Sequence, residues 1–294
     1  MTIFSGIITA LITPFENDKI NFTSLEKLIE NQIDAEISSI VVGGSTGEGI
    51  SLLEKEYYEL IEKSVRISSG RINIIAGLTS TATINCIDKV KSLCALKVNG
   101  LMCTIPHYVK PEQSGIIQHF RAISQNTSVP VMMYSHPGRT GSSLEDSTLL
   151  NIAKLRKVEA IKDASSDIEK PLRIRPEIKP NFSFLSGDDS AILAYSANGG
   201  VGCVSVISNV MPKVMQQINH YCQNLDFYSA RGLMQRILPI ISAVGSESNP
   251  IGIKYLAYKL GLSTDEIRLP LTWASAKTQK IIDEIIPLLK ELEK

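Results

Sequence analysis

The sequence predicts an α/β protein, a (β/α)₈ TIM barrel with a C-terminal helical extension. Apolar, strand-like segments alternate with amphipathic helical patterns at intervals of roughly 25–30 residues through the first two thirds of the chain. After residue 208 the strand-like segments stop, and only helical patterns follow.

Eight segments have the nearly continuous apolar character of strands in a buried parallel sheet. They span residues 5–12, 39–44, 72–77, 98–105, 129–135, 158–164, 182–187 and 201–207. Because helical patterns separate them, we expect the helices to cover the outer face of the sheet. Eight such units fit a closed barrel, and an open doubly wound sheet is the alternative.

The segments between the strands show the i, i+3, i+4, i+7 spacing of amphipathic helices. This spacing is carried by Leu25, Leu28, Ile29 and Ile33, and again by Leu53, Tyr57, Leu60, Ile61 and Val65. Three pairs have the capping-box spacing that predicts a helix start: Thr23 with Glu26, Ser51 with Glu54, and Ser142 with Glu145.

Four further helical patterns fill residues 211–222, 226–242, 250–260 and 276–292. No linker or low-complexity stretch separates them from the preceding segments. We therefore expect a catalytic barrel over residues 1–224 and a helical layer over residues 225–294 that packs on it.

The composition is that of a globular protein, with 44% hydrophobic and 20% charged residues. Lysine plus arginine equals aspartate plus glutamate at 30 each, so no global positive field would hold a nucleic acid. No segment has the ~18 consecutive apolar residues of a membrane span. The apolar start of the chain carries no basic leader. We expect a soluble cytoplasmic enzyme with neither nucleic acid nor membrane as a partner.

The five cysteines form no C-x-x-C pair, and each lies in an apolar or helical stretch. They are Cys86, Cys94, Cys103, Cys203 and Cys222. This usage predicts reduced packing residues rather than disulfides or metal ligands.

The sixth strand-like segment carries a lysine between two alanines. Side chains alternate between the faces of a strand, so Ala160, Lys162 and Ala164 share one face. If this face points into the barrel, an ammonium group is costly to desolvate there, and the neutral amine can attack a carbonyl carbon. The alternative is a lysine at a strand end whose amine reaches the solvent.

A glycine-rich loop, residues 43–49, follows the second strand-like segment. Its Ser45 and Thr46 can present hydroxyl and backbone N–H groups to a carboxylate or a phosphate. The loop also fits the G-x-S-x-G pattern of serine hydrolases, which need a late histidine on a loop, whereas His220 lies in a helical pattern. A plain turn is the third alternative.

Polar side chains also follow the fourth and fifth segments: Tyr108 after the fourth, Tyr134 at the end of the fifth, and Arg139 in the loop beyond. Each tyrosine can pack or transfer a proton, and the arginine can be a surface charge or bind a carboxylate. Because the active sites of such barrels lie at the carboxyl ends of the strands, these residues predict a site there. His107 and His136 have no partner at a metal-ligand spacing, so we expect no metal and no other cofactor.

Together these motifs resemble the dihydrodipicolinate synthase and N-acetylneuraminate lyase family of class I aldolases. The resemblance covers essentially the whole chain. It is carried by residues 10–15 (ALITPF), 44–48 (GSTGE), 161–162 (IK), 186–189 (SGDD), 249–250 (NP) and 268–271 (RLPL), and by the strand that contains Tyr134.

The resemblance implies that Lys162 forms a Schiff base with the ketone of pyruvate and that the resulting enamine is the carbon nucleophile. Tyr134 would shuttle the protons, with Ser45 and Tyr108 as its relay. Tyr108 would reach in from a neighbouring subunit. The family is usually a homotetramer, and we expect such a dimer of dimers here.

The resemblance also implies which residues contact the substrates. Thr46 and the backbone of Val204 would bind the pyruvate carboxylate, with Gly187 as a further contact. Arg139 resembles the arginine that holds the carboxylate of aspartate 4-semialdehyde in the synthases, and neuraminate lyases carry none there. Ser135 stands where synthases commonly have asparagine.

We therefore expect condensation of pyruvate with aspartate 4-semialdehyde, toward diaminopimelate and lysine. Ser45 favours a lyase instead, since synthases usually have a second threonine there. The alternatives are another class I pyruvate aldolase, acting on N-acetylneuraminate or a 2-keto-3-deoxy sugar acid, and an inactive barrel kept as a binding protein.

Many members of the family are inhibited by lysine, held in a polar cage at a subunit interface. The matching positions here are Thr81, Asn85, Tyr57 and His107. Asn85 replaces a glutamate, and a neutral amide cannot pair with the ligand's ammonium group as a carboxylate does. We expect millimolar lysine to inhibit only weakly.

Overall fold

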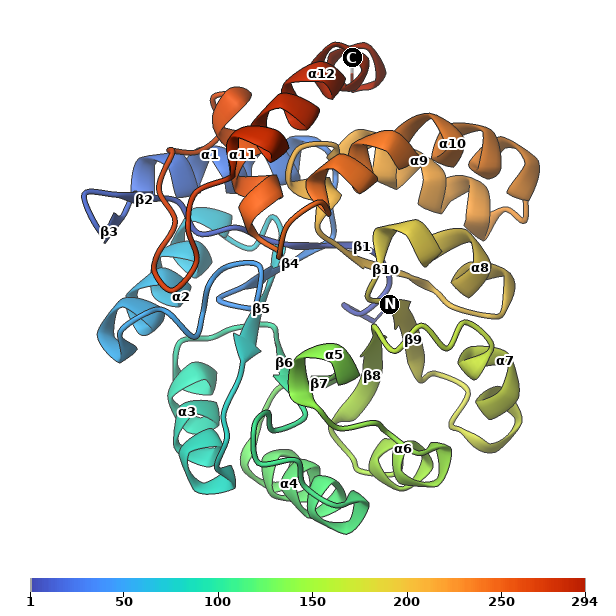
Figure 1. Ribbon diagram of the computed structural model, residues 1–294. Helices are drawn as coiled ribbons and strands as arrows, with labels where there is room; N and C mark the ends of the chain where they lie inside the picture. The colour runs from blue at the N-terminus through green and yellow to red at the C-terminus, as the bar shows by residue number, and fades with distance from the viewer. Residues whose placement is uncertain (1, 294) are drawn as a thin grey trace.

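The computed structural model describes residues 2–293 and has eight parallel strands that close into a barrel (Figure 1). The barrel strands are β1 (Gly6–Ala10), β4 (Ser39–Val42), β5 (Asn73–Leu78), β6 (Gly100–Thr104), β7 (Val131–Ser135), β8 (Val158–Asp163), β9 (Ser183–Ser186) and β10 (Gly202–Ser205). Each strand pairs with the next, and β1 closes the ring by pairing with both β4 and β10. All eight strands lie within one or two residues of the predicted segments, or inside them, and the barrel prediction is confirmed.

Helices surround the barrel because each strand is followed by a segment with one apolar face (Figure 1). The outer helices are α1 (Phe22–Asp34), α2 (Glu54–Ser68), α3 (Thr83–Ala95), α4 (Gln113–Asn126), α6 (Asp146–Ala153), α7 (Lys170–Ile174), α8 (Ile192–Ala197) and α9 (Pro212–Gln223). Short elements lie between them: the β2–β3 hairpin (Phe15–Glu16 and Lys19–Ile20), α5 (Pro137–Thr140), η1 (Arg175–Glu177), η2 (Asp189–Ala191) and η3 (Ile207–Asn209).

The inward-facing side chains of the strands fill the barrel. This inner cluster consists of Phe4, Ile8, Ala10, Val41, Ile75, Met102, Met132, Tyr134, Ala160, Leu185 and Val204. Phe4 is completely buried at the amino end of the strands, where a side chain at Gly100 would meet Ile3 and Phe4. The outward-facing strand residues pack against the helices and form the larger part of the core.

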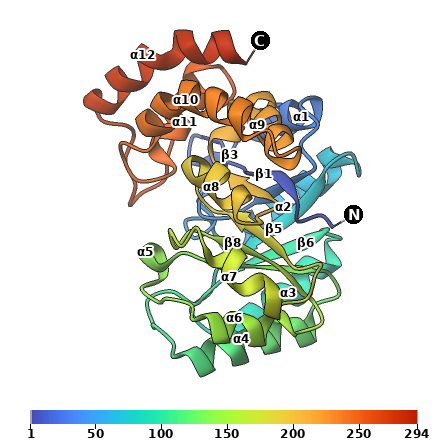
Figure 2. The same cartoon turned by 90° about the vertical axis from the view of Figure 1, so that its right-hand side faces the viewer.

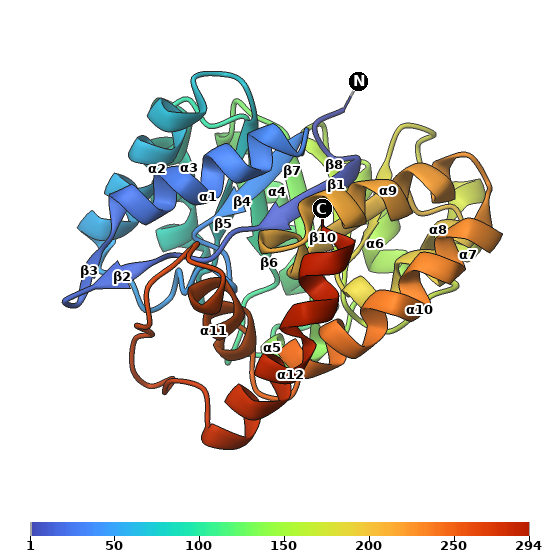
Figure 3. The same ribbon diagram turned by 90° about the horizontal axis from the view of Figure 1, so that it is seen from above.

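Three more helices form a layer on one side of the barrel: α10 (Phe227–Val244), α11 (Ile251–Lys259) and α12 (Ala276–Leu292). Figure 2 shows them together with α9 at the top of the view, and Figure 3 shows α12 between α11 and α10. The helix α10 contacts α9, α11 and α12. No helix of residues 2–293 combines the length and the apolar character that a membrane crossing requires.

The three predicted capping boxes are wrong. The N-cap of α1 is Asn21 rather than Thr23, and its side chain accepts a hydrogen bond from the Ser24 N–H. The boxes at Ser51 and Ser142 fail because α2 begins at Glu54 and α6 at Asp146, two to three residues later than those pairs require. In α2 the glutamate half of a box is supplied by Glu56, which accepts from the backbone N–H of Leu53.

Candidate active site

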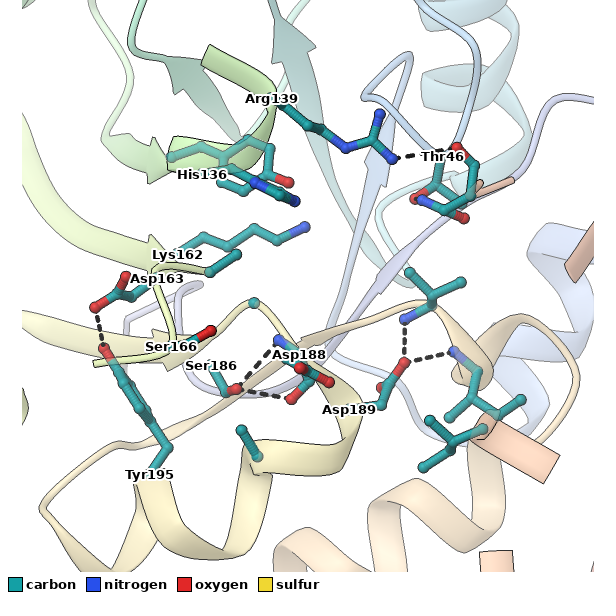
Figure 4. A pocket seen from close by; sticks show the side chains of 18 of the residues that line it. Thr46, His136, Arg139, Lys162, Asp163, Ser166, Ser186, Asp188, Asp189 and Tyr195 are labelled. Atoms are coloured by element: carbon teal, nitrogen blue, oxygen red, sulfur yellow. Dashed lines mark hydrogen bonds between the residues drawn. The ribbon is translucent and has the colours of Figure 1, made fainter. Parts of the chain in front are cut away.

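A cavity of about 450 Å³ lies at the carboxyl end of the barrel, where Figure 4 shows side chains from several strand ends converging. It brings together five of the residues singled out in the sequence: Thr46, Tyr134, Arg139, Lys162 and Gly187. These come from four different strand ends, which is the arrangement that supports catalysis in this fold.

Lys162 points into this cavity from β8. Its neighbour Ala160 belongs to the inner cluster and Ala164 lines the cavity, so the three residues share the inward face as predicted. Lys162 is 4% exposed, and within residues 2–293 no carboxylate forms a salt bridge with it. Its Nζ lies 4.3 Å from the centre of the Tyr134 ring, on the adjacent strand β7. The amine is therefore buried, without an ionic partner among the described residues, and next to a phenol.

The nearest acid in sequence, Asp163, is paired elsewhere. Its Oδ2 lies 2.8 Å from the Lys170 Nζ, and both side chains are buried. The Tyr195 hydroxyl also donates to this carboxylate at 3.4 Å, and burial followed by the Asp163 charge raises the pKa of Tyr195. Lys170 thus balances the charge of Asp163 and leaves the amine of Lys162 without an ionic partner.

The glycine loop is held in place on both sides of Thr46. The Thr13 hydroxyl donates to the Gly47 carbonyl at 2.7 Å, and the Asn249 amide donates to the Thr46 hydroxyl at 2.9 Å. The loop folds back so tightly that a Cβ at Gly49 would lie 1.9 Å from the Gly43 carbonyl oxygen, so only glycine fits there. The first helix after the loop begins only at Glu54.

Glu48 anchors the same loop to the C-terminal layer. Its Oε1 lies 2.6 Å from the Nζ of Lys254 on α11, and its Oε2 accepts from the Arg268 backbone N–H at 3.0 Å. The Phe15 ring lies 4.4 Å from the Lys254 amine and also from the Arg268 guanidinium. The loop that carries Thr46 is therefore fixed by residues more than 200 positions away.

Arg139 lies in α5, above the cavity and exposed to solvent. Its Nη2 donates to the Asn249 carbonyl at 3.2 Å, so Asn249 contacts both Arg139 and Thr46. Reasoning from the residues alone did not single out Asn249. What indicated Asn249 was the Asn249-Pro250 dipeptide, which is part of the family resemblance.

The 186–189 segment begins a short helix rather than forming a free loop. Asp188 is the N-cap of η2 and accepts from the Ser190 N–H, and Gly187 lines the cavity. The Asp189 carboxylate accepts from the backbone N–H groups of Val206 and Ile207, both at 3.0 Å. Burial raises the pKa of Asp189, and these N–H groups oppose the rise.

Three residues of the predicted site do not line the cavity. Ser45 is half-buried in the glycine loop, and Val204 is completely buried in the inner cluster. Tyr108 is 89% exposed and has a positive φ of 69°, and no hydrogen bond within residues 2–293 joins its hydroxyl to Tyr134.

The serine hydrolase alternative does not fit. His220 lies on the exposed side of α9, and its Nε2 is 3.1 Å from the Nδ2 of Asn224, one turn further along the same helix. All five cysteines are free thiols, as predicted. Over residues 2–293 no three His, Cys, Asp or Glu side chains form a group that could hold a metal ion.

This chain is similar to known proteins in both sequence and structure. The profile of the "Dihydrodipicolinate synthetase family" matches residues 3–288. The 4-hydroxy-tetrahydrodipicolinate synthase of Rickettsia bellii (strain RML369-C) is 46% identical over 287 residues, 98% of each chain, and that of Rickettsia felis is 44% identical over the same share. The crystal structure of dihydrodipicolinate synthase from Aquifex aeolicus matches with a TM-score of 0.96 at 31% identity, covering 99% of both chains. The enzyme from Cyanidioschyzon merolae, with lysine bound, matches with a TM-score of 0.95 at 31% identity and the same coverage.

Proposed function

The chain belongs to the dihydrodipicolinate synthetase family, and from this membership and the geometry of the cavity we infer how it acts. It is a lyase of the class I aldolase type with 4-hydroxy-tetrahydrodipicolinate synthase activity. We propose that the substrates are pyruvate and aspartate 4-semialdehyde, and that the product serves diaminopimelate and lysine biosynthesis.

The observation that carries the mechanism is the state of Lys162, which is buried, inward-facing and without an ionic partner. Its neutral amine attacks the ketone carbon of pyruvate, and loss of water leaves an iminium ion. The iminium withdraws electrons from the adjacent methyl group, which loses a proton to give an enamine. The enamine carbon then attacks the aldehyde carbon of the second substrate.

Proton transfer and substrate binding fall to the residues around the amine. We assign Tyr134 as the proton shuttle because its ring lies against Lys162. Thr46 is proposed to bind the pyruvate carboxylate together with the Val204 backbone, and Gly187 to contact the substrate from β9. Arg139, at the mouth, is proposed to bind the carboxylate of the aldehyde substrate.

The relay through Ser45 and Tyr108 requires a second subunit. Large exposed side chains lie on the segments that follow β4 (Ile50 and Leu53) and β6 (Tyr108 and Val109), and exposed apolar patches mark association surfaces. We propose that this face meets its counterpart in a homotetramer built as a dimer of dimers. We also propose a cytoplasmic location and a division of the chain into a barrel at 1–224 and a helical layer at 225–294.

Borohydride reduction in the presence of pyruvate tests the mechanism. We expect the treatment to inactivate the enzyme and to leave a reduced pyruvyl adduct on Lys162, both with and without EDTA. Lys162→Arg should abolish the adduct, whereas Lys157→Arg, at a half-buried lysine outside the cavity whose amine donates to the Ser128 carbonyl, should leave it unchanged. An adduct on any other lysine, or loss of activity on adding the chelator, contradicts the mechanism.

The choice of second substrate has its own test. With pyruvate present, aspartate 4-semialdehyde should be consumed, whereas N-acetylmannosamine should not. The opposite result identifies a sugar-acid aldolase.

A further inference from the structure

One titratable side chain in the cavity has no part in the mechanism above. His136 follows β7 directly and precedes α5, and Figure 4 shows its ring pointing into the cavity between Arg139 and Lys162. The ring lies edge-on to Tyr134, with centroids 6.0 Å apart. It also packs on the backbone of α5, since a Cβ at Gly138 would lie 3.3 Å from its Cε1. His136 is therefore held in one place by two neighbours.

The hydrogen-bonding capacity of this ring is unused. Its Nδ1 is buried and has no partner, and no hydrogen bond among residues 2–293 involves its Nε2. A buried polar atom without a partner costs stability, and such atoms in a cavity commonly mark a ligand's place. The imidazole is thus positioned and free to bind.

The charges around the ring favour its neutral form. Arg139 and, once the Schiff base has formed, the iminium on Lys162 are the cations that flank it, Asp188 is the facing carboxylate, and Tyr134 is the facing phenol. Burial lowers the pKa of His136, and the Arg139 and Lys162 charges lower it further, while Asp188 opposes them. A neutral imidazole keeps a lone pair, which neither cation beside it can offer.

The position of the ring matches one group of the second substrate. With its carboxylate at Arg139 and its aldehyde carbon at the enamine on Lys162, aspartate 4-semialdehyde spans the space where His136 lies. Its α-ammonium group is the polar group between those two ends.

We propose that His136 accepts a hydrogen bond from this α-ammonium group and takes its proton so that the product ring can close. This inference rests on the proposed function. The first proton passes from the ammonium nitrogen to the imidazole. The freed amine lone pair forms a bond to the iminium carbon, and the π pair of that carbon–nitrogen double bond moves onto the Lys162 nitrogen. The imidazolium gives its proton to the Lys162 nitrogen, and the imidazole then takes a second proton from the new ring nitrogen. The electron pair freed on the ring nitrogen forms the C=N bond of the ring as the bond to the Lys162 nitrogen breaks and the neutral lysine amine departs with its electron pair. No outside reactant is needed.

His136→Gln tests this step, since the glutamine amide keeps hydrogen bonding but cannot take up a proton as imidazole does. We expect the variant to trap pyruvate with borohydride as the unchanged enzyme does, and to lose ~10²–10⁴-fold in kcat with little change in KM for the aldehyde. Because ring closure is blocked, borohydride should trap on Lys162 an adduct that contains both substrates, visible by intact-protein mass. A merely structural role would not produce this adduct.

His136→Asn is the second variant, and the exposed His220→Gln is the control, which should behave as the unchanged enzyme. Unchanged kcat in both His136 variants, or loss of turnover without the two-substrate adduct, overturns the proposal. Failure of the proposed function looks different, because the unchanged enzyme would then not consume aspartate 4-semialdehyde at all.

Discussion

The amine of Lys254 and the carboxylate of Glu48 lie 2.6 Å apart with both side chains completely buried. This pair joins α11 of the C-terminal layer to the loop that carries Thr46. Burial lowers the pKa of Lys254, and the Glu48 carboxylate opposes that shift. The pair ties the stability of the layer to the shape of the substrate-binding loop.

Glu48→Gln should lower the free energy of unfolding by ~3–5 kcal/mol, because the Lys254 charge is then buried without its partner. The double variant Glu48→Gln/Lys254→Met should recover most of that loss. Lys259→Met is the matched control, since the Lys259–Asp283 pair lies at the surface, and its loss should change the free energy of unfolding far less. Urea titration measures the free energy of unfolding of all three variants. An equal loss of stability in Glu48→Gln and Lys259→Met would contradict the argument.

Tyr134→Phe should keep the fold and reduce turnover by ~10²–10⁴-fold, the usual contribution of a positioned proton-transfer group. The ring stays, so its packing in the inner cluster and against Lys162 is preserved. Steady-state rates measure the effect, and the midpoint of thermal unfolding controls for the fold. Turnover within threefold of the unchanged enzyme would remove Tyr134 from the mechanism.

Arg139→Ala should still trap pyruvate but lose efficiency with the aldehyde. Removing one charged hydrogen bond costs ~1.5–3 kcal/mol, which is about ten- to a hundredfold in kcat/KM. Arg139 is exposed and bonds only to the Asn249 carbonyl within the described chain, so stability should change little. An equal loss of pyruvate trapping would assign the arginine to the first substrate or to structure.

Lysine at millimolar concentration should inhibit this enzyme weakly. The four cage positions do line one cavity of about 640 Å³, but Asn85 supplies no charge and the Tyr57 hydroxyl already donates to the Gly77 carbonyl at 2.9 Å. Each lost charged contact costs ~1.5–3 kcal/mol. Initial rates measured at increasing lysine concentration test this, and the Cyanidioschyzon merolae enzyme, whose structure has lysine bound, is the reference for lysine binding. Half-inhibition below about a millimolar would show that the cage still binds.

His119 should make the protein lose stability as the pH falls. It is 3% exposed, and burial lowers its pKa from 6.5 to about 4. Between these values only the unfolded chain binds the proton, so unfolding becomes easier by ~1.4 kcal/mol for each pH unit lost. His119→Gln should reduce this slope, and the exposed His220→Asn should not. Urea unfolding at pH 7, 6 and 5 measures it, and an unchanged slope in His119→Gln refutes the assignment.

The strands could be predicted because a parallel strand that is buried on both faces requires a continuous run of apolar residues, which few other structures contain. The helix starts were not, because hydroxyl and glutamate residues at capping-box spacing also occur by chance in polar loops. Asn21 is the N-cap of α1, one residue before the helix begins, and no capping-box spacing marks that position in the sequence. The β2–β3 hairpin and α5 are too short to show any periodicity.

For the site, the sequence places residues at strand ends, and the fold then brings those ends together. Contacts between residues far apart in the sequence could not be predicted from it, above all those of Asn249 with Thr46 and of Lys254 with Glu48. The sequence does contain an indication of the contact between Lys254 and a buried acid. Lys254 is the only charged residue in the apolar first part of α11, Ile251–Ala257, where a buried lysine requires a buried acid.

The inner cluster, which fills the barrel from Phe4 up to Tyr134, has a kinetic consequence. Nothing can pass along the barrel axis, so both substrates, the water and the product must share one entrance at the carboxyl end. Lys162 lies deep in that entrance and Arg139 at its rim, so a bound aldehyde would block the way to the amine. We therefore expect pyruvate to bind first, and the water released on formation of its Schiff base to leave before the second substrate enters.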